Sequence, residues 1–386
     1  MSSPLLGVYR PAGPVFVGGR GSRLLGDDGK AYLDFTSGIG VNALGYADAT
    51  IERAIGDALA SGLIHASNLF RTLPAEALAA ELVARSFAER VFFCNSGAEA
   101  NEAAFKFARR WARERGGAGK HEVVAVHGSF HGRLFGSLAA TDRPAYREPF
   151  TPLMPGVRFV EPGDEAAARE AIRPESTAAV IVEPVQGEGG VRPLDAAYLR
   201  RLRALADEAG AALIFDEVQC GLGRTGHLFA HEAAGVEPDL LTLAKPLAGG
   251  LPMGAVLLAG RVADAIRPGD HATTFGGGPL VSAVALAVVR RIAEPAFLEA
   301  VRARGERVRE VLEPRVGRGG VMAVRGRGLM WGIELEGAAA PVVAAAMERG
   351  LLVLTAGERV VRLLPPLTID AAELEEGLSV LLEALG

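Results

Sequence analysis

The chain has 386 residues, of which 49% are hydrophobic and 23% are charged, and its formal net charge is −5. This balance is that of an ordinary globular protein, and the length exceeds a single core of about 100–200 residues, so we expect a large domain and a smaller one. The charges leave no basic stripe for a nucleic acid or an anionic membrane, and no apolar run reaches the roughly 18 residues of a membrane span.

Local patterns in the first part of the chain predict short strands followed by helices. Residues 15–35 are expected to form short strands broken by a turn at residues 26–29, where glycine and aspartate gather. Residues 51–63 and 74–84 are expected to be helical, the second because its apolar residues recur on one face.

A repeating alternation of strands and helices follows. The expected strands are short and apolar, at residues 90–94, 121–126, 157–160, 178–182, 211–215, 240–243 and 255–259. The expected helices are residues 95–115, 195–209, 279–294 and 296–312. Near-continuous apolar strands that alternate with helices are typical of a mainly parallel sheet covered on both faces, so we expect an α/β fold.

The last part of the chain has a different pattern. Residues 313–320 are rich in glycine, proline and arginine, which predicts a hinge. Beyond it the expected strands are residues 321–324, 329–335 and 360–364, and the expected helices are residues 339–349 and 371–385. This mixture predicts a small C-terminal α+β domain.

The cysteines and the first residues bear on where the protein works. Cys94 and Cys220 lie far apart in sequence, so we expect no disulfide framework and a reducing, cytoplasmic location. Residues 1–10 carry neither a basic nor an apolar leader segment, so we expect no signal peptide.

Polar residues follow several of the expected strands, and ligands gather at the carboxyl ends of strands in open α/β sheets. Ser96, Gly97 and Ala98 open a helix after the strand at 90–94. Small residues there leave backbone N–H groups free for an anion such as a phosphate. The alternative is a plain capping box made by Ser96 and Glu99.

Asp216 follows the strand at 211–215. A carboxylate at this edge can bind a metal ion, cap a helix or meet a protonated ring nitrogen, and its position alone does not choose among them. A metal site needs further ligands, and the sequence offers no pair of histidines at ligand spacing, so we expect no metal.

Lysine is rare in this chain, since only four of the 41 basic residues are lysines. Lys245 is the one that stands in an apolar stretch, directly after the strand at 240–243. Burial lowers the pKa of an amine and frees its lone pair for attack on an aldehyde, which favours a catalytic role over that of a surface cation. The alternative is a lysine whose stem packs while its charge reaches water.

The loop after the strand at 121–126 carries Phe130 and Arg133. The phenyl ring can stack on a flat ligand, and the guanidinium can clamp a carboxylate through two parallel hydrogen bonds. The alternative is a loop aromatic that packs on the core.

Taken together, these signals match one family. The chain resembles the class III (ornithine-type) aminotransferases in the stretches FFCNSGAEANEAAFKFAR, HGSFHGR, VIVEPVQGEGGV, LIFDEVQCGLGRTG, LAKPLAGGLPMGAV and TTFGGGP, in the family's order. The resemblance implies the type I fold of pyridoxal-phosphate (PLP) enzymes. It also implies an N-terminal segment at 1–50 belonging to the small domain, a large cofactor-binding domain at 51–312 and a C-terminal small domain at 313–386.

The resemblance implies a role for each matching residue around the cofactor ring. Lys245 would carry PLP as a Schiff base and later move the proton between substrate and cofactor. Asp216 would pair with the ring nitrogen and keep it protonated. Phe130 would stack on one face of the ring, Val218 would flank the other, and Gln219 would reach the phenolic oxygen.

The cofactor's phosphate would have ligands from two subunits. Ser96, Gly97 and Ala98 would hold it at the start of their helix. Thr274 would reach it from the neighbouring subunit, so the resemblance implies a homodimer with shared active sites.

Substrate recognition would depend on two arginines. Arg133 and Arg362 would each bind a substrate carboxylate, and Thr273 would line the same pocket. Glu188 would act as a switch that pairs with Arg362 when a substrate needs no anionic clamp there, so that one site accepts both an ω-amine donor and glutamate. The alternative is an ordinary ion pair.

The chain departs from the usual family pattern at three places. Leu134 stands where threonine is frequent, Gly278 where asparagine is common, and Phe70 where tyrosine is common. None of these changes removes a group that the chemistry needs, and the missing Tyr hydroxyl bears on the choice of substrate.

The reaction expected from the resemblance moves the terminal amino group of N-acetylornithine to 2-oxoglutarate, giving the semialdehyde and glutamate. Alternative donors are succinylornithine, ornithine, 4-aminobutyrate and a lysine-pathway amine. Two further alternatives are an intramolecular aminomutase on the same scaffold and a cofactor-binding protein without activity.

Overall fold

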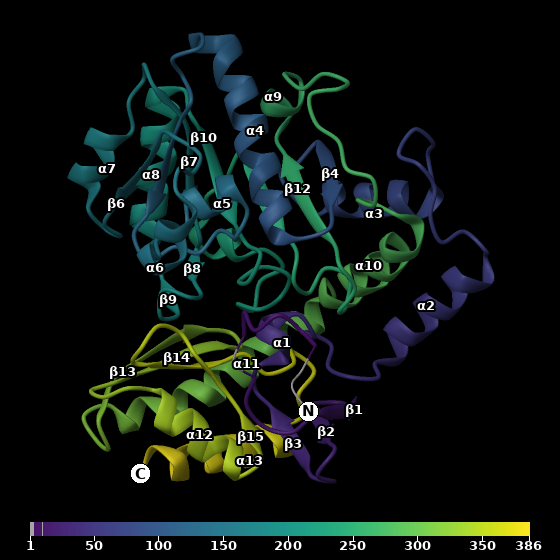
Figure 1. Cartoon of the computed structure of the whole chain (residues 1–386), viewed down its shortest axis with the longest axis vertical. Coiled ribbons are helices and arrows are strands. Elements are labelled where there is room, and N and C mark those ends of the chain that lie inside the picture. Colours follow the sequence, from purple (N-terminus) through teal and green to yellow (C-terminus); the bar gives the residue numbers. More distant parts are fainter. Residues whose placement is uncertain (1–3, 10) are drawn as a thin grey trace.

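The computed structural model describes residues 4–9 and 11–386. The expectation of no leader segment in residues 1–10 therefore lies partly outside the described residues. Figure 1 shows a part built around a twisted sheet, drawn in blue to green, above a part in which the purple beginning of the chain lies beside its yellow end. No helix in the described part of the chain is long and apolar enough to cross a membrane.

The central sheet has seven strands in the order β4-β12-β11-β10-β7-β5-β6. Their bounds are Arg90–Cys94 (β4), Gly254–Leu258 (β12), Leu240–Leu243 (β11), Ala212–Asp216 (β10), Thr177–Val182 (β7), Glu122–Val126 (β5) and Val157–Val160 (β6). Only β12 runs antiparallel to its neighbours. The predicted mainly parallel sheet is thus confirmed.

Helices cover both faces of this sheet, which explains the unbroken apolar runs of its strands. Along β10, Leu213 and Phe215 enter one core and Ala212 and Ile214 enter the other, because successive side chains of a strand point to opposite faces. The helices of this part are α2 (Ala49–Ala60), α3 (Leu73–Ala84), α4 (Gly97–Gly116), α5 (Phe135–Ala139), α6 (Pro144–Arg147), α7 (Glu165–Ala171), α8 (Ala196–Ala209), α9 (Gly260–Ala263) and α10 (Pro279–Ile292).

A second core joins the two ends of the chain. The sheet β1-β2-β3-β15 pairs three early strands with a late one, and a second sheet has the order β13-β14-β17-β16. The strands are β1 (Phe16–Arg20), β2 (Arg23–Gly26), β3 (Ala31–Asp34), β13 (Val321–Arg327), β14 (Met330–Leu335), β15 (Leu351–Leu352), β16 (Leu354–Thr355) and β17 (Val360–Leu363). The helices here are α1 (Ser37–Gly40), α11 (Pro295–Leu312), α12 (Ala340–Glu348) and α13 (Ala371–Leu385).

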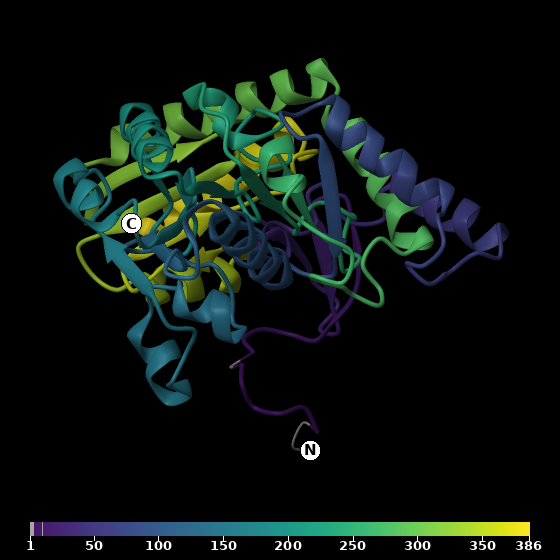
Figure 2. The ribbon, with the colours of Figure 1, turned by 90° about the horizontal axis from the view of Figure 1, so that it is seen from above.

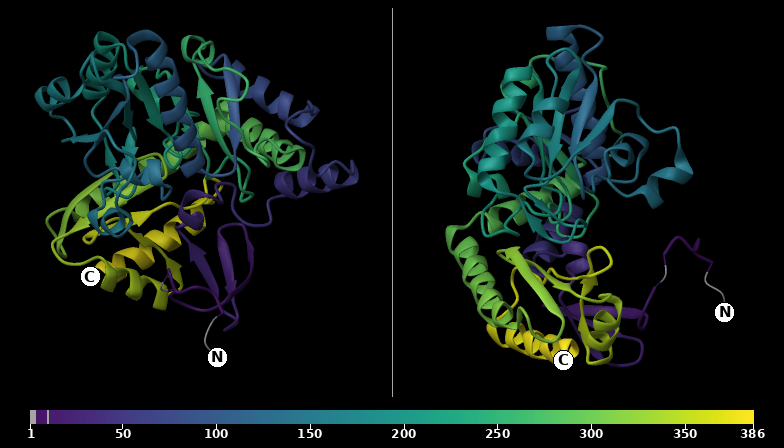
Figure 3. Two further views of the ribbon diagram at one scale, coloured as in Figure 1. Left: turned by 45° about the horizontal axis from the view of Figure 1, so that its top comes forward. Right: turned by 90° about the vertical axis from the view of Figure 1, so that its left-hand side faces the viewer.

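Long-range pairing makes this second core continuous. Leu351 of β15 pairs in parallel with Leu33 of β3, and Phe35 packs in the same cluster as Leu378 of α13. Helix α11 contributes Val308, so the second core begins before residue 313. Figure 2, seen from above, and the right-hand view of Figure 3 show the purple residues 4–9 lying away from the body of the molecule.

Most predicted elements lie within a few residues of their expected places, and the misses are all short. Local patterns did not predict the one-turn helices, helix α7, the hairpin β8 (Val185–Gln186) and β9 (Arg192–Pro193), or the two-residue strands β15 and β16. Such elements carry too few residues for a periodic pattern, and neighbours far away in sequence stabilise them.

Candidate active site

A cavity of about 380 Å³ lies at the carboxyl edge of the central sheet. Because β4, β5, β7, β10 and β11 all run in one direction, the residues that follow them meet at this edge. The cavity brings together ten of the predicted site residues, namely Ser96, Gly97, Ala98, Phe130, Arg133, Glu188, Asp216, Val218, Gln219 and Lys245.

Asp216 is held by a buried network of hydrogen bonds. Its Oδ2 accepts from Asn101 Nδ2 at 2.7 Å and lies 2.7 Å from His131 Nδ1, and its Oδ1 accepts from the backbone N–H of Val218 at 3.0 Å. Thr242 Oγ1 donates to Asn101 Oδ1 at 2.9 Å, which fixes the orientation of the amide. The carboxylate therefore has one position at the floor of the cavity.

The same network controls the charge on Asp216. Burial by itself raises the pKa of this carboxyl, but the hydrogen bond and charge of His131, with the bonds from Val218 and Asn101, outweigh it and lower the pKa. Asp216 therefore stays ionised despite being only 3% exposed.

Glu183, which follows β7, has the opposite balance. Burial raises the pKa of this carboxyl to about 7, and the charge of Asp216 adds to the rise, against the opposing effect of His131. Its oxygens accept the backbone N–H groups of Phe130 at 2.9 Å and Gly187 at 3.0 Å. The two buried carboxyls thus have pKa values shifted in opposite directions, lowered for Asp216 and raised for Glu183.

Lys245 lines the cavity just beyond the end of β11. Burial lowers the pKa of its amine, and the charge of Asp216 opposes the shift. Among the described residues, no hydrogen bond or ion pair engages the amine, and its lowered pKa favours the neutral form, which carries the lone pair for nucleophilic attack.

The start of α4 is capped by a side chain and leaves two backbone N–H groups without a partner. Ser96 Oγ accepts the backbone N–H of Glu99 at 3.2 Å, as the capping alternative predicts. The backbone N–H groups of Gly97 and Ala98 have no acceptor among the described residues and line the cavity. A Cβ on Gly97 would lie 2.6 Å from Val218 Cγ1, so glycine is needed where these two segments meet.

Two arginines lie at this cavity or directly behind its wall, and they differ in their partners. The guanidinium of Arg133 lies 3.6 Å from the ring centroid of Tyr146, and it forms no ion pair with any described carboxylate. Arg362 lies behind the cavity wall, where its Nη1 is 2.6 Å from Glu188 Oε1 and 3.2 Å from Gln219 Oε1. One arginine is therefore open and the other is neutralised.

Thr273 and Thr274 are not among the residues that line this cavity. Thr273 Oγ1 accepts from Asn95 Nδ2 at 3.2 Å, which places it beside the start of α4. Thr274 is exposed on the surface of the chain.

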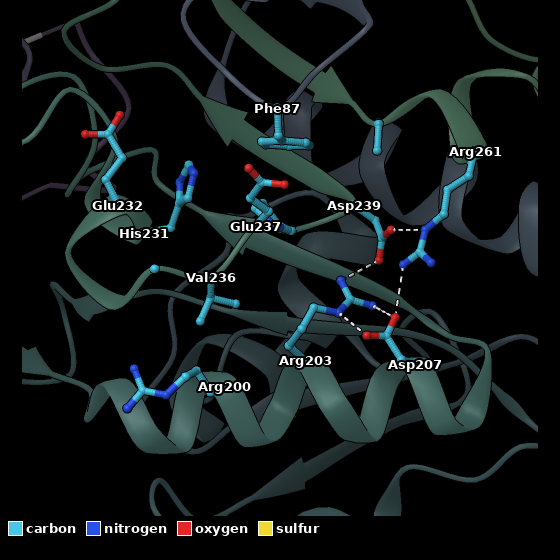
Figure 4. Close-up of a pocket in the computed structure, with 13 residues that line it drawn as sticks. Phe87, Arg200, Arg203, Asp207, His231, Glu232, Val236, Glu237, Asp239 and Arg261 are labelled. Carbon is cyan, nitrogen blue, oxygen red and sulfur yellow. Dashed lines mark hydrogen bonds and ion pairs between the residues drawn. The ribbon is translucent and has the colours of Figure 1, made fainter.

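Figure 4 shows a second, larger cavity of about 720 Å³, between α8 and the segment before β11. Its arginines already have partners: Arg203 bonds Asp207 at 2.7 Å and Asp239 at 2.8 Å, and Arg261 bonds the same two carboxylates. None of the predicted site residues lines it, and it contains no lysine.

Sequence reasoning missed three residues of the site, Asn101, His131 and Glu183. Asn101 carried a signal that could have been used, since it is a polar residue on the alanine-rich face of α4 that packs on the sheet. His131 and Glu183 lay beside the predicted residues, but only the folded chain shows which polar atoms they contact.

The family model of class-III aminotransferases matches residues 10–385, and the chain therefore belongs to this family. Enzymes of this class depend on PLP, so the chain is a PLP-dependent aminotransferase.

Similar proteins carry more specific names. The chain is 51% identical to the mitochondrial acetylornithine aminotransferase of Alnus glutinosa, over 99% of this chain and 85% of that protein. It is 46% identical to the acetylornithine aminotransferase of Xanthomonas campestris pv. campestris, over 97% of this chain and 93% of that protein.

Solved structures agree with this placement. The N-acetylornithine aminotransferase of Stenotrophomonas maltophilia K279a superposes with a TM-score of 0.85 at 38% identity, over 97% of this chain and 96% of that chain. An ornithine aminotransferase of Toxoplasma gondii, which has PLP at its active site, superposes with a TM-score of 0.94 at 30% identity, over 99% of this chain and 91% of that chain.

Proposed function

We propose that this aminotransferase moves the terminal amino group of N-acetylornithine to 2-oxoglutarate, in arginine biosynthesis. The observation that carries the proposal is a pair of arginines: Arg133 is open at the cavity, and Arg362, behind the cavity wall, is neutralised by Glu188. An acylated ornithine offers one carboxylate, and 2-oxoglutarate offers two. The names of the most similar proteins support the same donor.

The residues present fit the cofactor. Unpartnered N–H groups of Gly97 and Ala98 at a helix start suit its phosphate, and the half-buried ring of Phe130 lies at the same cavity as Val218. PLP supplies an aldehyde that takes up the amino group and a protonated ring that withdraws electrons. Ser96 holds the helix start in place, and we assign Gln219 to the phenolic oxygen.

Two residues carry the chemistry in this proposal. The Lys245 amine, with its lowered pKa, binds the cofactor and then carries the proton between the substrate carbon and the cofactor. Asp216, with its lowered pKa, supplies the negative charge that keeps the ring nitrogen protonated. One cavity thus favours the neutral form of its amine and the ionised form of its carboxyl.

Substrate binding follows from the two arginines. Arg133 binds the carboxylate that every substrate shares, and its stacking on Tyr146 orients the guanidinium without consuming its charge. Arg362 binds the second carboxylate of glutamate or 2-oxoglutarate once Glu188 moves aside. When the substrate carries a neutral acyl group instead, Glu188 stays paired with Arg362. We assign Thr273 to the same pocket.

We infer that the active enzyme is a homodimer. Large apolar side chains are exposed beside the site, with Leu69 89%, Phe70 72% and Phe275 66% exposed. Asn68 Nδ2 donates to Thr273 O at 2.6 Å, so residues 68–70 lie next to the loop that carries Thr274. A dimer that covers this surface lets Thr274 reach the phosphate in the partner subunit.

We also infer a cytoplasmic location, which the free and buried cysteines Cys94 and Cys220 support.

The function is tested with a panel of amine donors and 2-oxoglutarate as acceptor, and the formation of glutamate is measured for each donor. N-acetylornithine should give the highest kcat/KM. Higher values for succinylornithine, ornithine, 4-aminobutyrate or a lysine-pathway amine would transfer the assignment to that donor. Turnover of a donor without any 2-oxo acid would indicate an aminomutase, and no change in the cofactor's absorbance with any donor would discard catalysis.

A further inference from the structure

The loop that carries Glu188 has a strained backbone. It joins β8 to β9 at residues 187–191, and Val191 has φ +49° although it is branched at Cβ and completely buried. Such a conformation is strained for a residue branched at Cβ and persists only where the surroundings hold it. Contacts from outside the loop must therefore hold it in this shape.

Those contacts come from three paired residues, one on each of the neighbouring strands β13, β14 and β17. Arg325 of β13 pairs with Gly332 of β14, and Gly332 pairs with Arg362 of β17. A Cβ on Gly332 would lie 2.8 Å from Val191 Cβ and 3.1 Å from Val191 Cγ2. Val191 therefore sits directly on Gly332, between the two paired arginines.

The arginines hold the loop on either side of that contact. Arg325 Nε donates to Gly190 O at 2.8 Å, and Arg325 Nη1 pairs with Glu334 Oε2 at 2.5 Å. Arg362 Nη1 pairs with the Glu188 carboxylate at 2.6 Å. Away from the sheet, Arg143 Nη2 donates to Glu188 O. The position of the Glu188 side chain thus depends on residues that do not line the cavity.

We propose that Arg325 and Gly332 are positioning residues that set how firmly Glu188 neutralises Arg362, and hence the preference between substrates with a second carboxylate and substrates with a neutral acyl group. The proposal rests on the roles assigned above to Glu188 and Arg362. A dicarboxylate must displace Glu188 from Arg362, whereas a ligand without a second carboxylate leaves the pair closed. Loosening the loop therefore favours the dicarboxylate.

The test uses the PLP-loaded enzyme and two unreactive probes, glutarate with two carboxylates and pentanoate with one. Their dissociation constants are measured from the change in the absorbance of the bound cofactor. Arg325→Met should bind glutarate about threefold to tenfold more tightly than the parent enzyme, because that factor corresponds to the net contribution of one hydrogen bond. Its dissociation constant for pentanoate should be unchanged. Gly332→Ala, which pushes Val191 off the sheet, should shift the ratio in the same direction.

The matched control is Arg327→Met. Arg327 lies in the same strand, two residues further on, and its side chain has no hydrogen bond or ion pair to any described residue. It should leave the ratio of the two constants unchanged. The melting temperature of each variant shows whether it folds, and if Gly332→Ala does not fold, the comparison of Arg325→Met with Arg327→Met still decides.

An unchanged ratio in folded Arg325→Met would overturn the proposal, as would an equal weakening of both probes, which indicates general loss of structure. Glu188→Gln in the same assay separates the proposal from its foundation. If Glu188→Gln does not tighten glutarate either, the pairing role assigned to Glu188 fails. If it does and Arg325→Met does not, the positioning role alone fails.

Discussion

Lys245 and Asp216 share one cavity, and burial by itself favours the neutral form of both side chains. Burial lowers the pKa of the Lys245 amine, which favours its neutral form. Asp216 escapes the corresponding rise because hydrogen bonds from His131, Val218 and Asn101 stabilise its charge. At the scale of single residues, the chemistry therefore depends on which buried charge has partners.

We expect Lys245→Ala to retain PLP through the contacts to its phosphate and ring, and to form no glutamate. The amine is the only group in the cavity proposed to attack the aldehyde, so its loss removes the chemical step. Equilibrium dialysis measures retention of the cofactor, and glutamate release measures turnover. Normal turnover in this variant would refute the role of Lys245.

A second prediction at this scale concerns Glu183 in the cofactor-free protein. Its pKa is about 7 in the folded chain against 4.5 as the ordinary value, so between these pH values the folded state binds more protons than the unfolded state. The stability contributed by this carboxyl is therefore complete below about pH 4.5 and is lost as the pH rises through about 7.

Urea unfolding of the parent protein and of Glu183→Gln at pH 5 and pH 8, at one protein concentration, checks this sign. The free energy of unfolding of the parent minus that of the variant should fall by up to about 3 kcal/mol between the two pH values. Titrating groups that do not interact with Glu183 cancel in the difference, whereas Asp216 and His131, which do interact with it, contribute to it. An equal difference at both pH values would contradict the raised pKa.

Helix α4 shows how one element can have two separable duties. Its cap, Ser96, stabilises the helix, and its free N–H groups at Gly97 and Ala98 face the cavity. Because capping and anion binding use different atoms, substitutions should separate them.

We expect Ser96→Ala to lower the free energy of unfolding by about 1 kcal/mol. Gly97→Ala should weaken PLP binding by about tenfold or more, because the new Cβ meets Val218 at 2.6 Å and moves the wall of the cavity. Urea unfolding and a fluorescence titration with PLP measure the two effects. Unchanged PLP affinity in Gly97→Ala would argue against a phosphate at this helix start.

At the scale of the whole molecule, the proposed site is incomplete in one subunit, because Thr274 does not line the cavity of its own chain. The neighbouring apolar side chains, exemplified by Phe70 and Phe275, are exposed in the isolated chain. Burying them against a second copy would complete the site and remove an apolar patch from water.

Mixing two defective variants tests the shared site. Lys245→Ala and Thr274→Asp should each lose most activity as pure proteins, the second because a negative charge repels the phosphate. Subunit exchange should restore activity, since one site of the mixed dimer then has both Lys245 and Thr274 intact. Sedimentation confirms the dimer in each sample, and a mixture that stays inactive despite exchange would indicate that Thr274 serves its own subunit.

Much of the site was accessible from local patterns. An apolar strand followed by a polar residue predicts the carboxyl edge of a parallel sheet, and Asp216 and Lys245 follow such strands. Their meeting in one cavity requires that the strands are parallel neighbours. The alternation of strands and helices implied the parallel direction, and the structure shows that β10 and β11 are adjacent. The resemblance to class III aminotransferases then supplied chemical roles that no local pattern contains.

Contacts between distant segments could not be predicted from local patterns. Nothing near Gly332 indicates that Val191 rests on it, or that Arg325 and Arg362 flank that contact, because strand register is decided by packing of whole faces. The pairing of β15 with β3 likewise depends on the second core closing. Local sequence carries short-range preferences, whereas register and the charge state of buried groups are properties of surroundings that exist only once the chain has folded.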